Sequence, residues 1–110
     1  MSPQTVQEYM QVMRTRFDPT AAEGLTAVYQ FRLSGSPGGQ YHLVVADGAC
    51  AAQEGQHPKP NVTFAMSDKD CIGLFNGNLD GPSLYMQGRL KIEGDFELAL
   101  RLPAMFPKPR

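Results

Sequence analysis

Apolar and polar side chains alternate along several stretches of the first two thirds of the chain, which is the pattern of half-buried β-strands. In the first stretch Tyr29, Phe31 and Leu33 share one face. The strands predicted in this way are 25–34, 41–46, 49–54 and 61–66. A turn sequence follows the first strand, and Asp47-Gly48 follows the second. Such tight turns predict that the first three strands are antiparallel, because a parallel pair needs a long crossover.

Helical spacing replaces this alternation after the fourth strand. Ser67 is a predicted N-cap, and Asp68 and Asp70 stand in the first turn, where the positive end of the helix dipole favours acidic groups. Gly77 is a predicted helix end, because glycine accepts the left-handed conformation that is common there. Pro82 predicts the start of a second, short helix, since its missing N–H costs nothing at the first helical position.

One more strand and one more helix follow. Strict alternation puts Leu90 and Ile92 on the covered face of a fifth strand. The last helix begins after Asp95, and its apolar side is formed by Phe96, Leu98, Ala99, Leu100 and Leu102. Pro103 predicts that this helix breaks at 101–102, because proline has no N–H for the helical ladder.

The N-terminal stretch predicts a further helix. Ser2-Pro3 suits its start and Asp18-Pro19 its end. Its apolar stripe is Val6, Tyr9, Met10, Val12, Met13 and Phe17. We therefore predict an α+β fold in a single domain, 1–110. It has an antiparallel sheet of about five strands, a three-strand meander plus two, covered by the N-terminal helix and the C-terminal helices.

Composition and charge narrow the function classes. The chain has 110 residues and a net charge of −1, which gives no electrostatic case for nucleic acid as a partner. No apolar run approaches the roughly 20 residues of a membrane-spanning helix, and the N-terminus has no apolar core of a secretory signal. Two cysteines that stand far apart in the sequence favour a reducing compartment and argue against zinc. We predict a cytoplasmic location.

Few side chains suit catalysis. His42 is predicted on the outer face of its strand, and His57 lies in a loop. Cys71 falls on the apolar side of its helix, where a buried thiol behaves as a small hydrophobe, and the sequence places no histidine beside Cys50. The glycines match neither a phosphate-binding loop nor a dinucleotide fingerprint. We predict no catalytic residue, no metal site and no cofactor.

One long run of the second half, FNGNLDGPSLYMQGRLKIEGDFELALRL, resembles the signature half of the sterol carrier protein, type-two family of nonspecific lipid-transfer domains. The shared features are a helix that ends at Gly77, a short helix from Pro82 to Tyr85, a strand from Gly88 to Gly94 and a Leu-rich helix from Phe96 to Leu102. The likeness continues upstream in order and spacing and covers nearly the whole chain. It implies the α+β fold already predicted from the pattern.

The resemblance also implies a ligand. In that family the C-terminal helices and the covered sheet face line a tunnel for fatty acyl chains, acyl-CoA, sterols or other long-chain lipids. The matching positions here are Phe75, Leu84, Tyr85, Met86, Leu98 and Leu102, to which we add Met105 and Phe106 as predicted residues of the tunnel mouth. From the residues alone the first interpretation of these side chains is a filled core, and only the resemblance favours a tunnel. Tyr85 suits either a polar contact to the ligand or a core ring with a solvated hydroxyl.

Three functions follow, in order of preference. The first is non-catalytic intracellular lipid binding or transfer. The second is an accessory or scaffold domain for an enzyme of lipid or quinone metabolism, with the apolar C-terminal tail as a docking element. The third is an enzyme that acts on an acyl thioester, for which no nucleophile–base pair is visible in the sequence. The sequence leaves the choice between monomer and dimer open.

Overall fold

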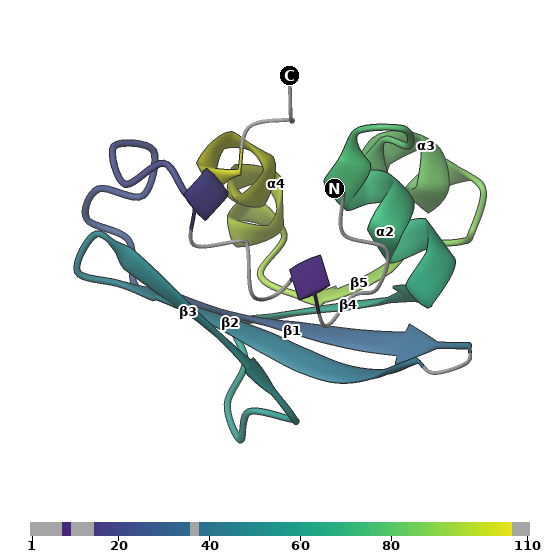
Figure 1. The fold of residues 1–110 in the computed structure, drawn as a ribbon, viewed down its shortest axis with the longest axis horizontal. Coiled ribbons are helices and arrows are strands. Elements are labelled where there is room, and N and C mark those ends of the chain that lie inside the picture. The colour runs from purple at the N-terminus through teal and green to yellow at the C-terminus, as the bar shows by residue number, and fades with distance from the viewer. Residues whose placement is uncertain (1–7, 10–14, 36–37, 107–110) are drawn as a thin grey trace.

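The computed structural model describes residues 8–9, 15–35 and 38–106. Within them, five strands form one sheet in the order β3-β2-β1-β4-β5, and three helices lie over one face of it (Figure 1). The elements are β1 (Ala27–Ser34), β2 (Gly39–Ala46), β3 (Ala49–Glu54), β4 (Val62–Ser67), α2 (Asp68–Asn76), α3 (Gly81–Met86), β5 (Lys91–Gly94) and α4 (Phe96–Met105). The α+β class and the element order from β1 to α4 are therefore as predicted.

The sheet is mixed, which corrects the prediction of a purely antiparallel sheet. Strands β1, β2 and β3 form the predicted antiparallel meander, but β4 pairs with β1 in parallel, so that Phe31 lies opposite Phe64. The chain leaves β3 at the sheet edge and passes β2 and β1 in the connection 55–61 before it enters β4. Seven residues without a helix are enough for this crossover, although parallel strands are usually joined by a dozen or more.

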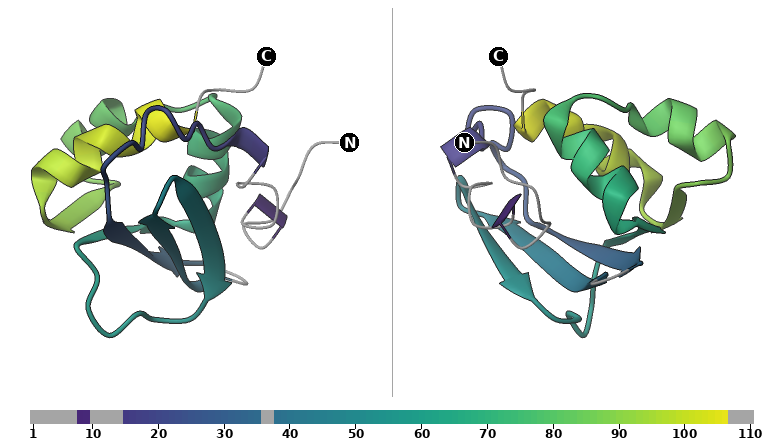
Figure 2. Two further views of the ribbon diagram at one scale, coloured as in Figure 1. Left: turned by 90° about the vertical axis from the view of Figure 1, so that its left-hand side faces the viewer. Right: turned by 45° about the vertical axis from the view of Figure 1, so that its right-hand side comes forward.

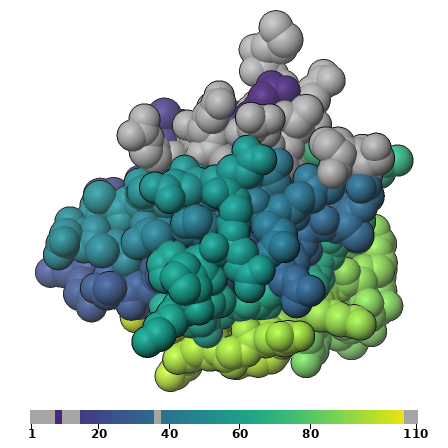
Figure 3. All heavy atoms as spheres, turned by 90° about the horizontal axis from the view of Figure 1, so that it is seen from below, coloured from purple at the N-terminus to yellow at the C-terminus, as the bar shows by residue number. Residues whose placement is uncertain are grey.

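Gln30 ties this crossover to the sheet. Its side chain is almost completely buried on the outer face, and its amide donates to the carbonyl oxygens of Tyr41 at 3.1 Å and Gly55 at 3.2 Å. Its own oxygen accepts from the backbone N–H of His57 at 2.8 Å. Figure 3 shows the teal atoms of β3 and the connection that follows it lying across this face. The outer face is therefore partly covered by the chain itself.

The predicted starts of the three helices in the second half, and the predicted end of the first of them, are confirmed. Ser67 accepts a hydrogen bond from the N–H of Asp70 at 3.1 Å, and Gly77 ends α2 with a φ of 80°. Asp80 caps α3 and Asp95 caps α4 in the same way, each with its carboxylate accepting from the N–H three residues later. These caps satisfy N–H groups that the helices leave without an internal partner.

The predicted break at 101–102 is wrong, because α4 continues through Pro103 to Met105. Proline removes one backbone hydrogen bond from the helix. Burial of the next apolar side chains offsets this cost, since Met105 and Phe106 both lie in the core. In addition, the N–H of Asp18 donates to the Met105 carbonyl at 2.7 Å.

Most of the predicted N-terminal helix lies outside the described residues. Helical backbone is described at Glu8–Tyr9 and at Thr15–Arg16. Tyr9 is buried, its ring centroid lies 5.1 Å from that of Phe75, and its hydroxyl donates to the side-chain oxygen of Asn76. This part of the N-terminal stretch therefore packs against α2.

Candidate functional site

An apolar cluster lies between the sheet and the helices, which both views in Figure 2 place on the same side of the sheet. Its floor is aromatic. The rings of Phe31 and Phe64 stack with centroids 5.4 Å apart, Tyr29 stacks on Phe64 at 6.2 Å, and Phe75 meets Phe31 edge-on at 6.2 Å. Phe31 and Phe64 are brought together by the parallel pairing of β1 and β4.

The structure brings six of the eight predicted ligand-binding residues into this cluster. Leu84, Met105 and Phe106 are buried within it, and Phe75, Leu98 and Leu102 are half-buried against it. They come from α2, α3 and α4, and from the residue that follows α4. Three successive helices thus direct apolar side chains to one region of the sheet.

Tyr85 and Met86 lie elsewhere, on the exposed side of α3. The Tyr85 ring does not enter the cluster. It meets Phe96 edge-on, with ring centroids 5.7 Å apart. Because Leu84 is buried while its two successors are exposed, one short helix contributes both to the cluster and to the surface above it.

Several cluster residues were not among the predicted ligand-binding set. Tyr29 donates its hydroxyl hydrogen to the Leu98 carbonyl at 2.9 Å, which links β1 to α4. Burial raises the pKa of this hydroxyl, and the nearby charge of Arg101 opposes that shift. Phe17 packs on Phe106 with ring centroids 5.5 Å apart. The alternation in β1 pointed to Tyr29, whereas no sequence signal connected Phe17 with the end of α4.

The ionisable groups beside the cluster are held in structural contacts. Asp68 accepts a hydrogen bond from the backbone N–H of Gly38 at 3.1 Å. Burial raises the pKa of the Cys71 thiol, and the neighbouring Asp68 raises it further, so the sulfur stays protonated near neutral pH. Asp70 pairs with Arg89, which lies partly in solvent, so this pair adds little to stability. Cys71 therefore behaves as an apolar side chain.

Both histidines lie at the outer face, away from the cluster. His42 is opposite Gln30 in the β1–β2 register, and its Nδ1 donates to the Gly55 carbonyl at 3.0 Å. The Nδ1 of His57 accepts from the N–H of Lys59 at 3.0 Å. The outer-face prediction for His42 is confirmed, and the side chain is buried there because the crossover covers it.

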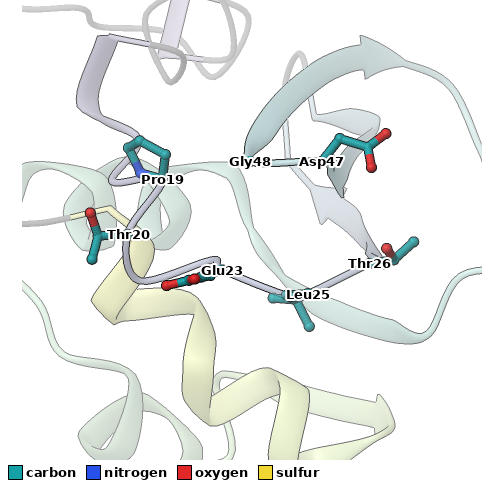
Figure 4. Close-up of a pocket in the computed structure, with 8 residues that line it drawn as sticks. Pro19, Thr20, Glu23, Leu25, Thr26, Asp47 and Gly48 are labelled. Carbon is teal, nitrogen blue, oxygen red and sulfur yellow. The ribbon is translucent and has the colours of Figure 1, made fainter.

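An open pocket of about 560 Å³ lies where residues 19–26 approach the β2–β3 turn (Figure 4). It is lined by Pro19, Thr20, Glu23, Gly24, Leu25, Thr26, Asp47 and Gly48. The lining brings two carboxylates and two hydroxyls to an open surface. Such a surface suits water better than an acyl chain.

Over residues 8–9, 15–35 and 38–106, no set of three or more His, Cys, Asp or Glu side chains is arranged to hold a metal ion. None of the helices described is long and apolar enough to cross a bilayer.

The sheet is mixed and five-stranded, helices lie over one of its faces, and an apolar cluster lies between the two layers. This arrangement is that of the sterol-carrier-like α+β domains. The sequence profile of the SCP-2 sterol transfer family matches residues 8–107, and the chain belongs to that family. The resemblance found in the sequence is thereby confirmed.

Similar proteins place the domain in different contexts. Hydroxysteroid dehydrogenase-like protein 2 of Danio rerio is 32% identical over 101 residues, which are 91% of this chain but 24% of that protein. The chain thus spans about a quarter of that relative. Among solved structures, the sterol carrier protein domain 2 of Helicoverpa armigera aligns with a TM-score of 0.71 and 27% identity, covering 94% of this chain and 88% of that one. Palmitated SCP2L2 of Aedes aegypti aligns with a TM-score of 0.71 and 21% identity, covering 100% and 99%.

Proposed function

We propose that residues 1–110 form one non-catalytic domain that binds and transfers a long-chain lipid. The observation that carries the proposal is the convergence of Phe75, Leu84, Leu98, Leu102, Met105 and Phe106 on one aromatic floor. Membership of the SCP-2 sterol transfer family supports it. A cytoplasmic location, predicted from the sequence, remains part of the proposal.

The cluster suits an acyl chain for physical reasons. Each methylene removed from water contributes about 0.8 kcal/mol, so a long chain contributes on the order of 10 kcal/mol. Association and ordering costs reduce this to roughly micromolar affinity, which lets a carrier also release its cargo. Met105 has a flexible thioether chain that adapts to irregular apolar ligands. Selectivity then depends on shape more than on directed hydrogen bonds.

The half-buried residues define the proposed entrance. Phe75, Leu98 and Leu102 contact the cluster and are also partly open to solvent. A ligand that enters beside them replaces water on their exposed sides and then meets the floor at Phe31 and Phe64. Tyr29 stands at the same place, since its hydroxyl binds the Leu98 carbonyl.

Native mass spectrometry of the purified chain with palmitate is the first test. We expect one lipid-sized adduct per chain and micromolar binding of a fluorescent fatty acid. Leu98→Trp should fill the entrance and weaken that binding about tenfold or more, whereas Leu100→Trp, an equal change on the exposed side of α4, should leave it unchanged. Leu102→Phe provides a second filling variant if the first fails to fold. Wild-type affinity in a folded Leu98→Trp protein would count against this site.

A second candidate is an accessory domain that serves an enzyme. It is favoured by the relative from Danio rerio, in which the matching segment is about a quarter of a protein named for a dehydrogenase. The test is calorimetric titration of this chain with the remaining three quarters of that relative. Saturable binding would support the accessory function, and the absence of heat at concentrations up to about 100 μM would exclude a stable complex of this kind.

A further inference from the structure

The fold brings the two histidines of the chain together on the outer face of the sheet, away from the proposed lipid site. His42 comes from β2 and His57 from the crossover 55–61, and their rings meet edge-on with centroids 5.3 Å apart. His42 is buried and His57 is half-buried. Histidine is the side chain whose ordinary charge change falls near physiological pH. Charge that mild acid adds to the side chains thus arises mainly at this one place.

The hydrogen-bond partners fix which ring nitrogen of each histidine carries a hydrogen. The Nδ1 of His42 lies 3.0 Å from the Gly55 carbonyl oxygen, and a carbonyl only accepts, so this nitrogen carries a hydrogen. The Nδ1 of His57 lies 3.0 Å from the backbone nitrogen of Lys59, and a backbone N–H only donates, so this nitrogen carries none. The contact with Lys59 therefore requires a neutral His57 with its hydrogen on Nε2.

Gln30 joins the two histidines into one network. It stands opposite His42 in the β1–β2 register, and its amide shares the Gly55 carbonyl with the His42 ring. Its side-chain oxygen accepts from the N–H of His57 at 2.8 Å. These contacts hold the first half of the crossover on the sheet, so a change that frees His57 also loosens the crossover.

Mild acid acts directly on this network. A proton added to His57 goes to Nδ1, and two N–H groups then face each other where His57 and Lys59 were hydrogen-bonded. When His42 is charged as well, two cations stand with their ring centroids 5.3 Å apart and repel each other. Arg32, two residues past Gln30 on the same face of β1, and Lys59 itself add further positive charge. Acid therefore favours release of the crossover, in which the imidazoles bind water instead.

The carboxylates of the flanking strands β3 and β5 lie away from the pair. On β3 the residue opposite His42 is the uncharged Gln53. Glu54 comes next, but it is paired with Tyr41, whose side chain belongs to the inner cluster. Glu93 on β5 stands three strands from His42, which is roughly 14 Å at the usual strand spacing. Neither carboxylate is therefore placed to compensate a positive charge on the two rings.

We propose that His42 and His57 form an acid-sensitive fastening, which holds the crossover on the outer face at neutral pH and releases it as the pH falls toward 5.5. The released form has solvated imidazoles that take up protons without losing a contact. Release is therefore favoured as the pH falls through the ordinary imidazole range, about pH 6–7. The stability that these contacts contribute is present above that range and lost below it. The fastening does not depend on lipid binding, because the pair lies on the opposite face of the sheet.

Urea denaturation at pH 7.0 and pH 5.5, followed by circular dichroism, tests the fastening. For the wild type we expect the equilibrium constant of unfolding to rise about tenfold at the lower pH, in a window where carboxylates stay ionised. His57→Asn should match the wild type at pH 7.0, since an asparagine oxygen accepts from the N–H two residues later. It cannot be protonated there, so its acid response should fall below twofold. His42→Asn, whose amide still donates to Gly55, is the matched control and should keep a response of several-fold.

Two measurements on the wild type alone give a readout that needs no variant. The N–H groups of His57 and Lys59 are donors in the network. Their protection from hydrogen exchange, corrected for the intrinsic rate at each pH, should fall about tenfold from pH 7.0 to pH 5.5. Nitrogen-15 spectra at pH 7.0 should show the ring hydrogen of His42 on Nδ1 and that of His57 on Nε2. An equal acid response in the wild type and His57→Asn overturns the proposal, and so does unchanged protection of the two amides or a hydrogen on Nδ1 of His57.

Discussion

The two faces of the sheet are held by different forces. The outer face depends on directed hydrogen bonds from a few polar side chains, with Gln30 contacting two carbonyls and one N–H. The inner face depends on an apolar cluster, in which rings such as Phe31 and Phe64 stack without any donor–acceptor pair to fix their positions. Hydrogen bonds specify one arrangement, because each buried group left unpaired is costly. Apolar packing accepts a range of shapes of similar volume.

This difference suits the proposed function. A lipid-binding domain needs one face that stays fixed while the other admits ligands of different shape. Asn61 extends the fixed side, since its N–H donates to the Val28 carbonyl at 2.9 Å and its side-chain oxygen accepts from the Val28 N–H at 2.7 Å. The crossover is thus fastened at both ends, beside Gln30 and at the start of β4. Around the apolar cluster, the Tyr29 hydroxyl donates to the Leu98 carbonyl and the Asp18 N–H donates to the Met105 carbonyl, whereas the side chains of the cluster meet one another mainly through apolar contacts.

Replacing Gln30 should give the largest effect. Gln30→Leu keeps the approximate volume but leaves the His57 N–H without its partner and removes one donor from the Tyr41 and Gly55 carbonyls, of which Gly55 keeps the donor His42. We expect a loss of about 3 kcal/mol in the free energy of unfolding, from the cost of unpaired buried groups. Urea denaturation followed by circular dichroism measures it.

The control for Gln30 lies on the same strand. Arg32 points to the same face two residues further on, but it is exposed. Arg32→Leu should therefore change the free energy of unfolding by less than about 0.5 kcal/mol. Equal losses of unfolding free energy in the two variants would show that the crossover does not depend on Gln30. The proposed difference between the two faces of the sheet would then be wrong.

Removing the hydroxyl of Tyr29 should give a smaller effect on the inner face. Tyr29→Phe deletes the hydrogen bond to Leu98 but keeps the ring that stacks on Phe64. We expect a loss of about 1 kcal/mol, because the Leu98 carbonyl keeps its place in the helix and only one neutral hydrogen bond is lost. The same urea titration measures it, with Tyr85→Phe on the exposed side of α3 as a control that should change nothing. A loss as large as that of Gln30→Leu would mean that α4 is held by this bond and not by apolar packing.

The sequence predicted the local elements well because their signals are local. Alternation located the strands, and Ser67, Asp80 and Asp95 each cap the helix that follows them. The parallel pairing of β4 with β1 was missed, because nothing in the alternating pattern of 61–66 encodes which neighbour it takes. The buried state of Gln30 was missed for the same reason, since a polar residue on an outer face is buried only when a distant segment crosses it.

Prediction of the candidate site from the sequence was limited in the same way. The family resemblance selected six positions, to which we added two, and the structure separates them, with Leu84 inside and Met86 in solvent. Adjacent positions of one short helix differ in this way because α3 turns only one side toward the sheet. The helix break predicted from Pro103 was wrong because of tertiary packing, since the burial of Met105 and Phe106 outweighs the lost helical hydrogen bond.

In the folded protein we expect the thiol of Cys71 to stay unreactive. Burial raises the pKa of its thiol, and only the thiolate reacts with iodoacetamide. In a Cys50→Ser variant at pH 8, we therefore expect native Cys71 to be alkylated more than a hundredfold more slowly than in urea, as measured by mass spectrometry. The unfolded thiol ionises above about pH 8.5 while the folded one does not. The unfolded state then binds fewer protons, and the contribution of this thiol to the free energy of unfolding falls as the pH rises past that value. Fast alkylation of the folded protein would show an accessible, ionised thiol within the helical layer. An enzyme that uses this thiol as a nucleophile on acyl thioesters would then be a better interpretation of this face than a passive apolar cluster.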